Sequence, residues 1–246
     1  MIKLLQLDHV YGGYHQGKPV LHDISFSVNK GEIVGLIGLN GAGKSTAIKH
    51  VLGLMEAQKG EIRINGKRFL EDPNEYRRSY SFIPETPILY EDLTLQEHLH
   101  VTAMAYGLHS EELAERSALL LKEFRMEKML HWFPGHFSKG MRQKVMIMCA
   151  FLLYPPLYIV DEPFIGLDPI AIKSLLNHFV DMKEKGAGIL MSTHILSTAE
   201  RYCDRFIMLH HGKIIVEGTL DELREKTGMA ASAPLDDIYI EITKED

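Results

Sequence analysis

Hydrophobic and polar residues alternate in two segments near the N-terminus, Leu4–Val10 and Ile24–Val28. Alternation with a period of two is typical of strands that bury one face. The short run Ile33–Ile37 is apolar throughout and leads into a glycine-rich segment, which favours a buried strand followed by a turn. We therefore expect antiparallel strands near the N-terminus, followed by one buried strand.

Helical spacing of apolar residues dominates the middle of the chain. It predicts a helix from Lys44 to about Leu54, helical structure throughout residues 92–130, and a further helix over Ser138–Tyr154.

The dipeptide Asn65-Gly66 predicts a hairpin, because this pair accepts the left-handed backbone of a two-residue turn. Glu61–Ile64 and Arg68–Phe69 flank it and are the expected strands.

From residue 157 onward, short apolar runs alternate with helical patterns. The expected strands are Leu157–Val160, Ile189–Ser192, Arg205–Leu209 and Ile214–Glu217, and the expected helices are Ile170–Lys185 and Ile195–Cys203. This alternation predicts an α/β fold, in which helices cover both faces of a mostly parallel sheet. The all-helical stretch interrupts the alternation and predicts an inserted α-helical subdomain at about residues 86–153. We expect one domain over residues 1–225 and a C-terminal tail over 226–246.

Composition narrows the class of protein. Of the 246 residues, 46% are hydrophobic and 24% are charged, as in ordinary globular proteins. The net charge of −6 argues against a broad basic face, so we expect no nucleic-acid partner. The longest apolar run, Val145–Tyr154, is half of the roughly twenty residues that a membrane span needs. Two cysteines provide no disulfide framework, which fits a reducing cytoplasm.

The segment Gly38–Ser45, called the phosphate loop below, has the pattern G-x-x-x-x-G-K-[ST]. Glycines let successive backbone N–H groups curl around an anion, and the following helix points its positive end at it. A chance glycine-rich turn is the alternative, but a predicted strand precedes this segment and a helix follows. Lys44 is expected to reach the β- and γ-phosphates, and the Ser45 hydroxyl to bind Mg²⁺. The expected nucleotide-binding residues are Gly38, Asn40, Gly41, Ala42, Gly43, Lys44, Ser45 and Thr46.

Two acidic residues, Asp161 and Glu162, end the apolar strand that begins at Leu157. A buried strand would place Asp161 beside the phosphate loop, where its carboxylate can hold Mg²⁺ through water. Glu162 points elsewhere and is the candidate general base for an attacking water. An acidic strand end that faces solvent is the alternative, which the phosphate loop disfavours.

Three further motifs follow in order: Ser138-Lys139-Gly140-Met141, Gly166-Leu167-Asp168 and Ser192-Thr193-His194. With the phosphate loop and the acidic pair, they resemble the nucleotide-binding subunits of ABC transporters over roughly residues 1–225. The spacings agree too, with 23 residues from Ser138 to Asp161 and 33 from Asp161 to His194. The resemblance implies a P-loop NTPase core of the RecA-like type, with an N-terminal antiparallel β subdomain and an inserted helical one.

The resemblance also implies a mechanism. ATP bound at Lys44 of one subunit would be closed by Ser138 and Gly140 of a second subunit in a head-to-tail dimer, with Asp168 in the adjoining loop. His194 would contact the γ-phosphate and orient the water near Glu162. Hydrolysis would power a separate integral-membrane subunit, which places this chain in the cytoplasm, on the inner face of the cell membrane. The rival function is a soluble ABC-type ATPase that acts as a regulatory switch.

An aromatic residue that stacks on adenine is expected before the second strand. Tyr14 is the candidate, and Tyr11 competes with it.

Two positions depart from the family pattern. Glu85 stands where the family usually has glutamine. We expect its carboxylate either to bind Mg²⁺ directly, as a third ligand beside Ser45 and Asp161, or to stay away from the phosphates until ATP leaves. Lys139 replaces a glycine of the family's signature motif, which is Ser138–Met141 in this chain. A lysine that faces water is the simpler interpretation, and contact with the phosphate bound by the other subunit is the alternative.

The segment after Glu85 is a candidate docking site for the membrane partner. It carries the apolar residues Ile88, Leu89, Tyr90 and Leu93 beside acids. Packing between the two subdomains is the alternative. Other stretches, such as Ile83–Pro87 and Lys144–Phe151, resemble an export-type branch of the family in Gram-positive bacteria.

Overall fold

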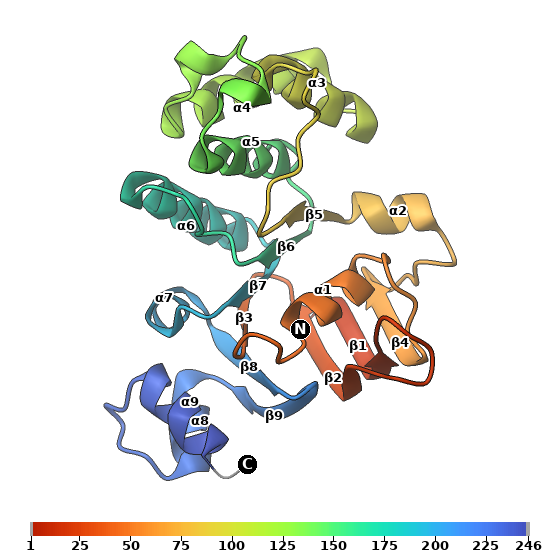
Figure 1. The fold of residues 1–246 in the computed structure, drawn as a ribbon, viewed down its shortest axis with the longest axis vertical. Coiled ribbons are helices and arrows are strands. Elements are labelled where there is room, and N and C mark those ends of the chain that lie inside the picture. Colours follow the sequence, from red (N-terminus) through yellow and green to blue (C-terminus); the bar gives the residue numbers. More distant parts are fainter. Residues whose placement is uncertain (1, 245–246) are drawn as a thin grey trace.

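A six-stranded sheet forms the centre of the computed structural model, which describes residues 2–244 (Figure 1). Its strand order is β5-β6-β7-β3-β8-β9. All neighbours are parallel except the hairpin of β8 and β9. In that order the strands are Tyr80–Ile83, Leu157–Asp161, Gly188–Thr193, Ile33–Ile37, Arg205–His210 and Lys213–Gly218. The predicted mostly parallel sheet is confirmed.

The register of the sheet places three of the five predicted motifs, the phosphate loop, the acidic pair and Ser192-Thr193-His194, at one edge. Ile37, the last residue of β3, lies opposite Thr193 of β7 and Met208 of β8. Asp161 at the end of β6 lies opposite Ser192. The carboxyl ends of parallel strands are the usual ligand-binding edge of such a sheet.

A second sheet, antiparallel and three-stranded, has the order β2-β1-β4. Its strands are β1 (Lys3–Gly12), β2 (Leu21–Asn29) and β4 (Lys59–Ile64). Residues from its inner face form one core with helix α1 (Lys44–Val51), which ends three residues before the expected Leu54.

The hairpin predicted at Asn65-Gly66 is only half correct. Both residues have the expected left-handed backbone, with φ of 51° and 78°. Arg68–Phe69 nevertheless forms no strand, and one bridge from Ile64 to Lys67 is all the pairing that follows. The chain turns instead into helix α2 (Pro73–Arg78), because the Phe69 ring packs edge-on against Tyr76 at a centroid distance of 5.5 Å.

The inserted lobe contains helices α3 (Leu95–Tyr106), α4 (Ser110–Glu123) and α5 (Lys139–Leu152), and packs with α6 (Pro169–Glu184) in one hydrophobic core. Short 3₁₀ turns lie at Glu127–Met129 and Pro134–His136. The expectation of helix throughout 92–130 is wrong. Gly107 ends α3 in the left-handed conformation with φ of 73°, a geometry that terminates helices.

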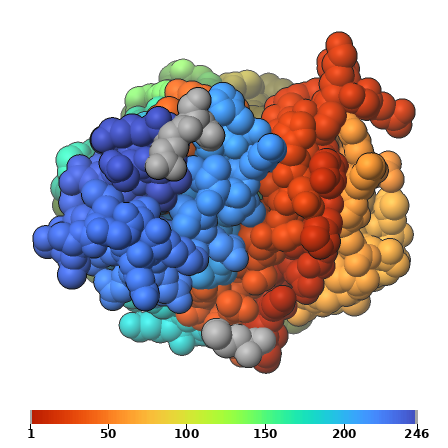
Figure 2. Space-filling view, turned by 90° about the horizontal axis from the view of Figure 1, so that it is seen from below, coloured from red at the N-terminus to blue at the C-terminus, as the bar shows by residue number. Residues whose placement is uncertain are grey.

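The C-terminal part of the chain forms helices α7 (Leu196–Tyr202), α8 (Leu220–Thr227) and α9 (Leu235–Thr243). The end of the domain at 225 stays a prediction, but the described part of the expected tail includes α9, which packs on β8 through Leu235 and Ile238. In Figure 2 the end of this region, in dark blue, is separated from the red N-terminal strands by the lighter blue of β8 and β9. Every helix within residues 2–244 is too short or too polar to cross a lipid bilayer.

Candidate nucleotide site

The phosphate loop joins the carboxyl end of β3 to the first turn of α1. Gly41 and Gly43 adopt left-handed φ values of 85° and 109°, which glycine accepts without strain. At Gly38 an added Cβ would lie 2.4 Å from the carbonyl oxygen of Leu209, so only glycine fits there. These positions explain why the motif needs its glycines, and the free N–H groups of α1 face the loop.

Lys44 is buried and ties the phosphate loop to the end of β6. Its Nζ donates to the carbonyl oxygen of Gly38 at 2.7 Å and to that of Leu39 at 3.4 Å. The same Nζ lies 3.5 Å from Oε1 of Glu162. The ammonium group and the carboxylate therefore share one low-dielectric environment.

The acidic pair is held by Ser192 of the neighbouring strand. The Ser192 hydroxyl donates to Oδ1 of Asp161, and it accepts from the backbone N–H of Glu162 at 3.2 Å. Both carboxyl residues are 7% exposed. The interpretation of the pair as a solvent-facing strand end is therefore wrong.

Glu162 itself has a strained backbone. Its φ of 45° is unusual for a residue with a side chain, and such strain costs about 1–3 kcal/mol. The conformation turns the carboxylate toward His194, whose Nδ1 lies 2.8 Å from Oε2 of Glu162. The backbone N–H of His194 donates to the same oxygen at 3.3 Å.

A cleft of about 460 Å³ opens over these groups. Its lining includes Tyr14, Asn40, Gly41, Gly43, Lys44, Ser45, Thr46, Glu85, Glu162 and His194. The structure thus brings together most of the predicted nucleotide and catalytic residues. Asp161 does not line the cleft; it is buried, and its Oδ1 accepts a hydrogen bond from the Ser192 hydroxyl.

Tyr14 lines the cleft, whereas the competing Tyr11 lies within β1 with Lys59 over its ring. A hydrogen bond with Thr46 is the main cause that lowers the pKa of Tyr14, and Lys49 lowers it further. Tyr14 is therefore linked to the start of α1, while the residue stays 57% exposed.

Ser138, Gly140 and Asp168 lie outside the lining of the cleft. Ser138 caps α5, because its hydroxyl accepts from the N–H of Met141 at 3.2 Å. Asp168 caps α6 and binds Lys144 Nζ at 2.8 Å, and this ion pair is the main cause of its lowered pKa.

Some residues near the site gave no readable signal in the sequence. Gln143 is fully buried and its amide donates to the carbonyl oxygen of Pro84 at 2.9 Å, so it anchors the loop that carries Glu85. Tyr239 of α9 contacts the phosphate loop from a position 200 residues away in the sequence.

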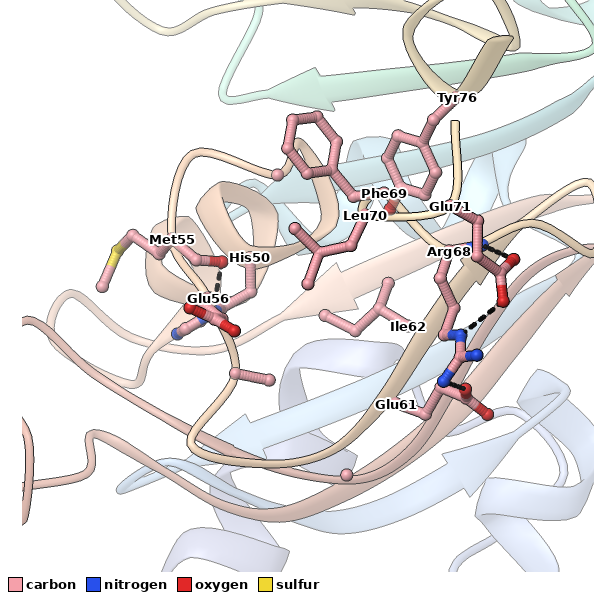
Figure 3. A pocket seen from close by; sticks show the side chains of 13 residues that line it. His50, Met55, Glu56, Glu61, Ile62, Arg68, Phe69, Leu70, Glu71 and Tyr76 are labelled. Carbon is pink, nitrogen blue, oxygen red and sulfur yellow. Dashed lines mark hydrogen bonds and ion pairs between the residues drawn. The ribbon is translucent and has the colours of Figure 1, made fainter. Parts of the chain in front are cut away.

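A second cavity, of about 590 Å³, lies at the other end of α1 (Figure 3). His50, Ile62, Phe69 and Tyr76 line it, and Arg68 at its edge is bound by Glu61 and Glu71. The predicted site residues are not part of its lining.

The sheet topology, the phosphate loop and the acidic pair define a P-loop ATPase. Comparison with known proteins shows which family of P-loop ATPases the chain belongs to. The family model described as ABC transporter matches residues 21–165, and the chain belongs to that family. It is an ATP-binding subunit of an ABC transporter and an ATPase.

Relatives support this placement over the full length. The chain is 61% identical to the ABC-type transporter ATP-binding protein EcsA of Bacillus subtilis (strain 168), covering 100% of this chain and 98% of EcsA. It is 36% identical to the bacitracin transport ATP-binding protein BcrA of Bacillus licheniformis, covering 92% and 72%.

Solved structures share this fold. One ATP-binding subunit of an ABC transporter superimposes with a TM-score of 0.95 at 58% identity, covering 98% of this chain and 99% of that one. A dimeric ATP-binding cassette in a post-hydrolysis state, bound to ADP and Pi, has a TM-score of 0.78 at 25% identity, covering 88% and 98%.

Proposed function

We propose that this chain hydrolyses ATP in a head-to-tail dimer and thereby powers export through a separate integral-membrane subunit. The observation that carries the proposal is the contact of 2.8 Å between His194 Nδ1 and Glu162 Oε2, beside Lys44. A base, a cation for phosphate charge and a second polar group therefore converge in one cleft.

Glu162, Lys44 and His194 have different roles in the proposed hydrolysis. Glu162 accepts the proton of the attacking water, as a carboxylate within reach of that water can do. Lys44 neutralises negative charge on the β- and γ-phosphates, which is the main contribution of proteins to phosphoryl transfer. His194 orients Glu162 and contacts the γ-phosphate.

Mg²⁺ is the metal that the donor set fits. Ser45 and Glu85 line the cleft, Asp161 ends β6 and is bound to Ser192, and all three offer the oxygen ligands that Mg²⁺ prefers. Mg²⁺ commonly takes only one or two protein oxygens and fills its shell with phosphates and water. When bound, it would offset charge on the phosphates; Ser45 and Asp161 would hold it, and Glu85 is the third candidate.

Adenine is assigned to Tyr14. The residue is at the cleft and more than half exposed, with Lys49 Nζ 5.0 Å from its ring centroid. Aromatic rings stack readily on bases, and this position leaves Tyr11 without a role in the nucleotide site.

The dimer completes the site. Ser138, Gly140 and Asp168 lie outside the cleft of their own chain, yet Ser138 caps a helix whose N-terminal end favours anions. In the dimer, this end would meet the γ-phosphate of ATP bound to the other subunit. The dimeric post-hydrolysis structure of a related cassette supports this arrangement.

The segment from Glu85 to Leu95 is the proposed docking site for the membrane subunit. Ile88 and Tyr90 are 79% and 69% exposed, while Leu89 packs against the helical core. Glu91 accepts two hydrogen bonds from Arg142 of α5, at 2.7 and 3.0 Å. Movement of α5 on dimer closure would therefore move the docking segment.

A relative with an export role supports the proposed direction of transport. The Nod factor export ATP-binding protein I of Sinorhizobium fredii is 35% identical over 88% of this chain. We place the protein on the cytoplasmic face of the cell membrane, held there by its partner and without nucleic acid.

The test is purification of the tagged chain from detergent-solubilised membranes. We expect a protein with several membrane spans, identified by mass spectrometry, in a fixed ratio to the chain. Ile88→Asp should lose this partner, while Met104→Asp, at an equally exposed site with 79% exposure, should keep it. Recovery of the chain without such a partner would contradict the transport role and favour the regulatory switch.

A further inference from the structure

The phosphate loop is held from outside by elements at the C-terminal end of the chain. The backbone N–H of Leu39, inside the loop, donates to the hydroxyl of Tyr239 at 3.0 Å. The N–H of Gly212, in the turn between β8 and β9, donates to the carbonyl oxygen of Ala42 at 2.9 Å. These two contacts fix the loop on the side of the C-terminal elements.

Tyr239 is itself held firmly. It is 5% exposed and lies on α9, whose neighbours Leu235 and Ile238 are fully buried against β8. The N–H of Leu235 donates to Glu200 of α7 at 2.8 Å, which fixes the start of α9. The hydroxyl is thus presented to the loop by a docked helix.

Leu39 connects this contact to the catalytic cluster. Its carbonyl oxygen accepts from the N–H of Ala42 at 3.1 Å and from Lys44 Nζ at 3.4 Å. One peptide segment therefore has its N–H bound by α9 and its carbonyl bound by the lysine that faces Glu162. A shift of α9 would move the group against which Lys44 is positioned.

We infer that Tyr239 is a positioning residue for the phosphate loop, so that docking of α9 and binding of nucleotide phosphates stabilise one another. The inference rests on the proposed role of the phosphate loop. A loop already held in its binding conformation loses less entropy when the ligand binds. The coupling is reciprocal. If docking of α9 stabilises the binding conformation of the loop, then bound nucleotide stabilises the docking of α9 by the same free energy.

Tyr239→Phe is the direct test, since it removes the hydroxyl and keeps the ring. Loss of one hydrogen bond of ordinary strength corresponds to about fivefold in affinity. We expect the Kd values for ATP and ADP to rise by about that factor in the folded variant. The matched control is Tyr80→Phe, which removes another buried hydroxyl, 3.0 Å from the carbonyl oxygen of Leu52, and should bind both nucleotides like the wild type.

Amide hydrogen exchange gives a readout that a merely structural role would not move. In the wild type, ATP should slow exchange across α9, and in Tyr239→Phe this slowing should be lost. Two results would overturn the inference. One is unchanged nucleotide affinity in Tyr239→Phe, and the other is a rate of amide exchange across α9 that ATP does not change in the wild type.

Lys44→Ala separates this inference from the site assignment beneath it. If Lys44→Ala still binds ATP like the wild type, the assignment of the phosphate loop is wrong. If it loses ATP while Tyr239→Phe binds normally, only the role of Tyr239 is contradicted.

Discussion

The imidazole of His194 and the carboxylate of Glu162 are 2.8 Å apart, and Lys44 Nζ lies 3.5 Å from the other oxygen of the same carboxylate. Glu162 is thus bound on both oxygens by groups that also face the cleft. Movement of either partner would change how the carboxylate meets water and phosphate. This arrangement makes the catalytic assignments open to test one residue at a time.

Glu162→Gln should abolish turnover while leaving ATP binding intact. The amide keeps the shape of the side chain but cannot accept the proton of water, and a general base is worth about 10²- to 10⁴-fold in rate. Steady-state ATPase assays measure the loss, and size-exclusion chromatography with ATP should show trapped dimers. The exposed substitution Glu111→Gln on α4 serves as control, and full activity in Glu162→Gln would sink the assignment.

His194→Ala should slow turnover less than Glu162→Gln does, because it removes the group that orients the carboxylate and keeps the base. The double variant should be no slower than Glu162→Gln alone, since residues that act as a unit are not additive. A double-mutant cycle of kcat values measures this. Additive losses would show that the two side chains act independently, despite their contact.

Glu85→Gln should keep ATP binding but shift the Mg²⁺ concentration that gives half-maximal activity. The carboxylate adds a full charge at the cleft, and one charge pair at 4 Å is worth about 4 kcal/mol at an effective dielectric constant of 20. The measurement is a Mg²⁺ titration of ATPase activity. Glu56→Gln, beside the second cavity, controls for loss of charge, and identical titrations for Glu85→Gln and the wild type would exclude a metal role for Glu85.

Gly140→Ala should destabilise the contact between the start of α5 and the loop before α6. An added Cβ at Gly140 would lie 2.2 Å from the carbonyl oxygen of Gly166, and such overpacking costs about 1–3 kcal/mol. The melting temperature and the ATPase activity should both fall. Gly135→Ala has no neighbouring atom within 4 Å of its new Cβ and should resemble the wild type. Equal melting temperatures for the two variants would contradict the steric argument.

The parts of the fold that periodicity encodes were predictable from sequence. Ile33–Ile37 forms a strand with the predicted bounds, and Ser138 caps the helix that it was expected to begin. The predicted strand at Arg68–Phe69 did not form, because Phe69 finds a partner in Tyr76 on a helix. Local pattern cannot show which distant ring a side chain will meet.

The candidate site divides in the same way. The phosphate loop is contiguous in sequence, so its composition reveals its geometry. The contact of Glu162 with His194 needs the pairing of two strands, although a motif at each strand end pointed to it. Tyr239 could not be predicted as a site residue, because nothing in the sequence around this tyrosine indicates that its hydroxyl contacts Leu39.

The contact between Leu39 and Tyr239 joins two residues that the ribosome adds at widely separated times. Leu39 leaves the ribosome 200 residues before the hydroxyl that binds its N–H. Chains fold from the N-terminus as they emerge, so the phosphate loop exists without this support while the residues between Leu39 and Tyr239 are made. A newly made subunit therefore gains this support for its phosphate loop only after α9 has been made and has docked.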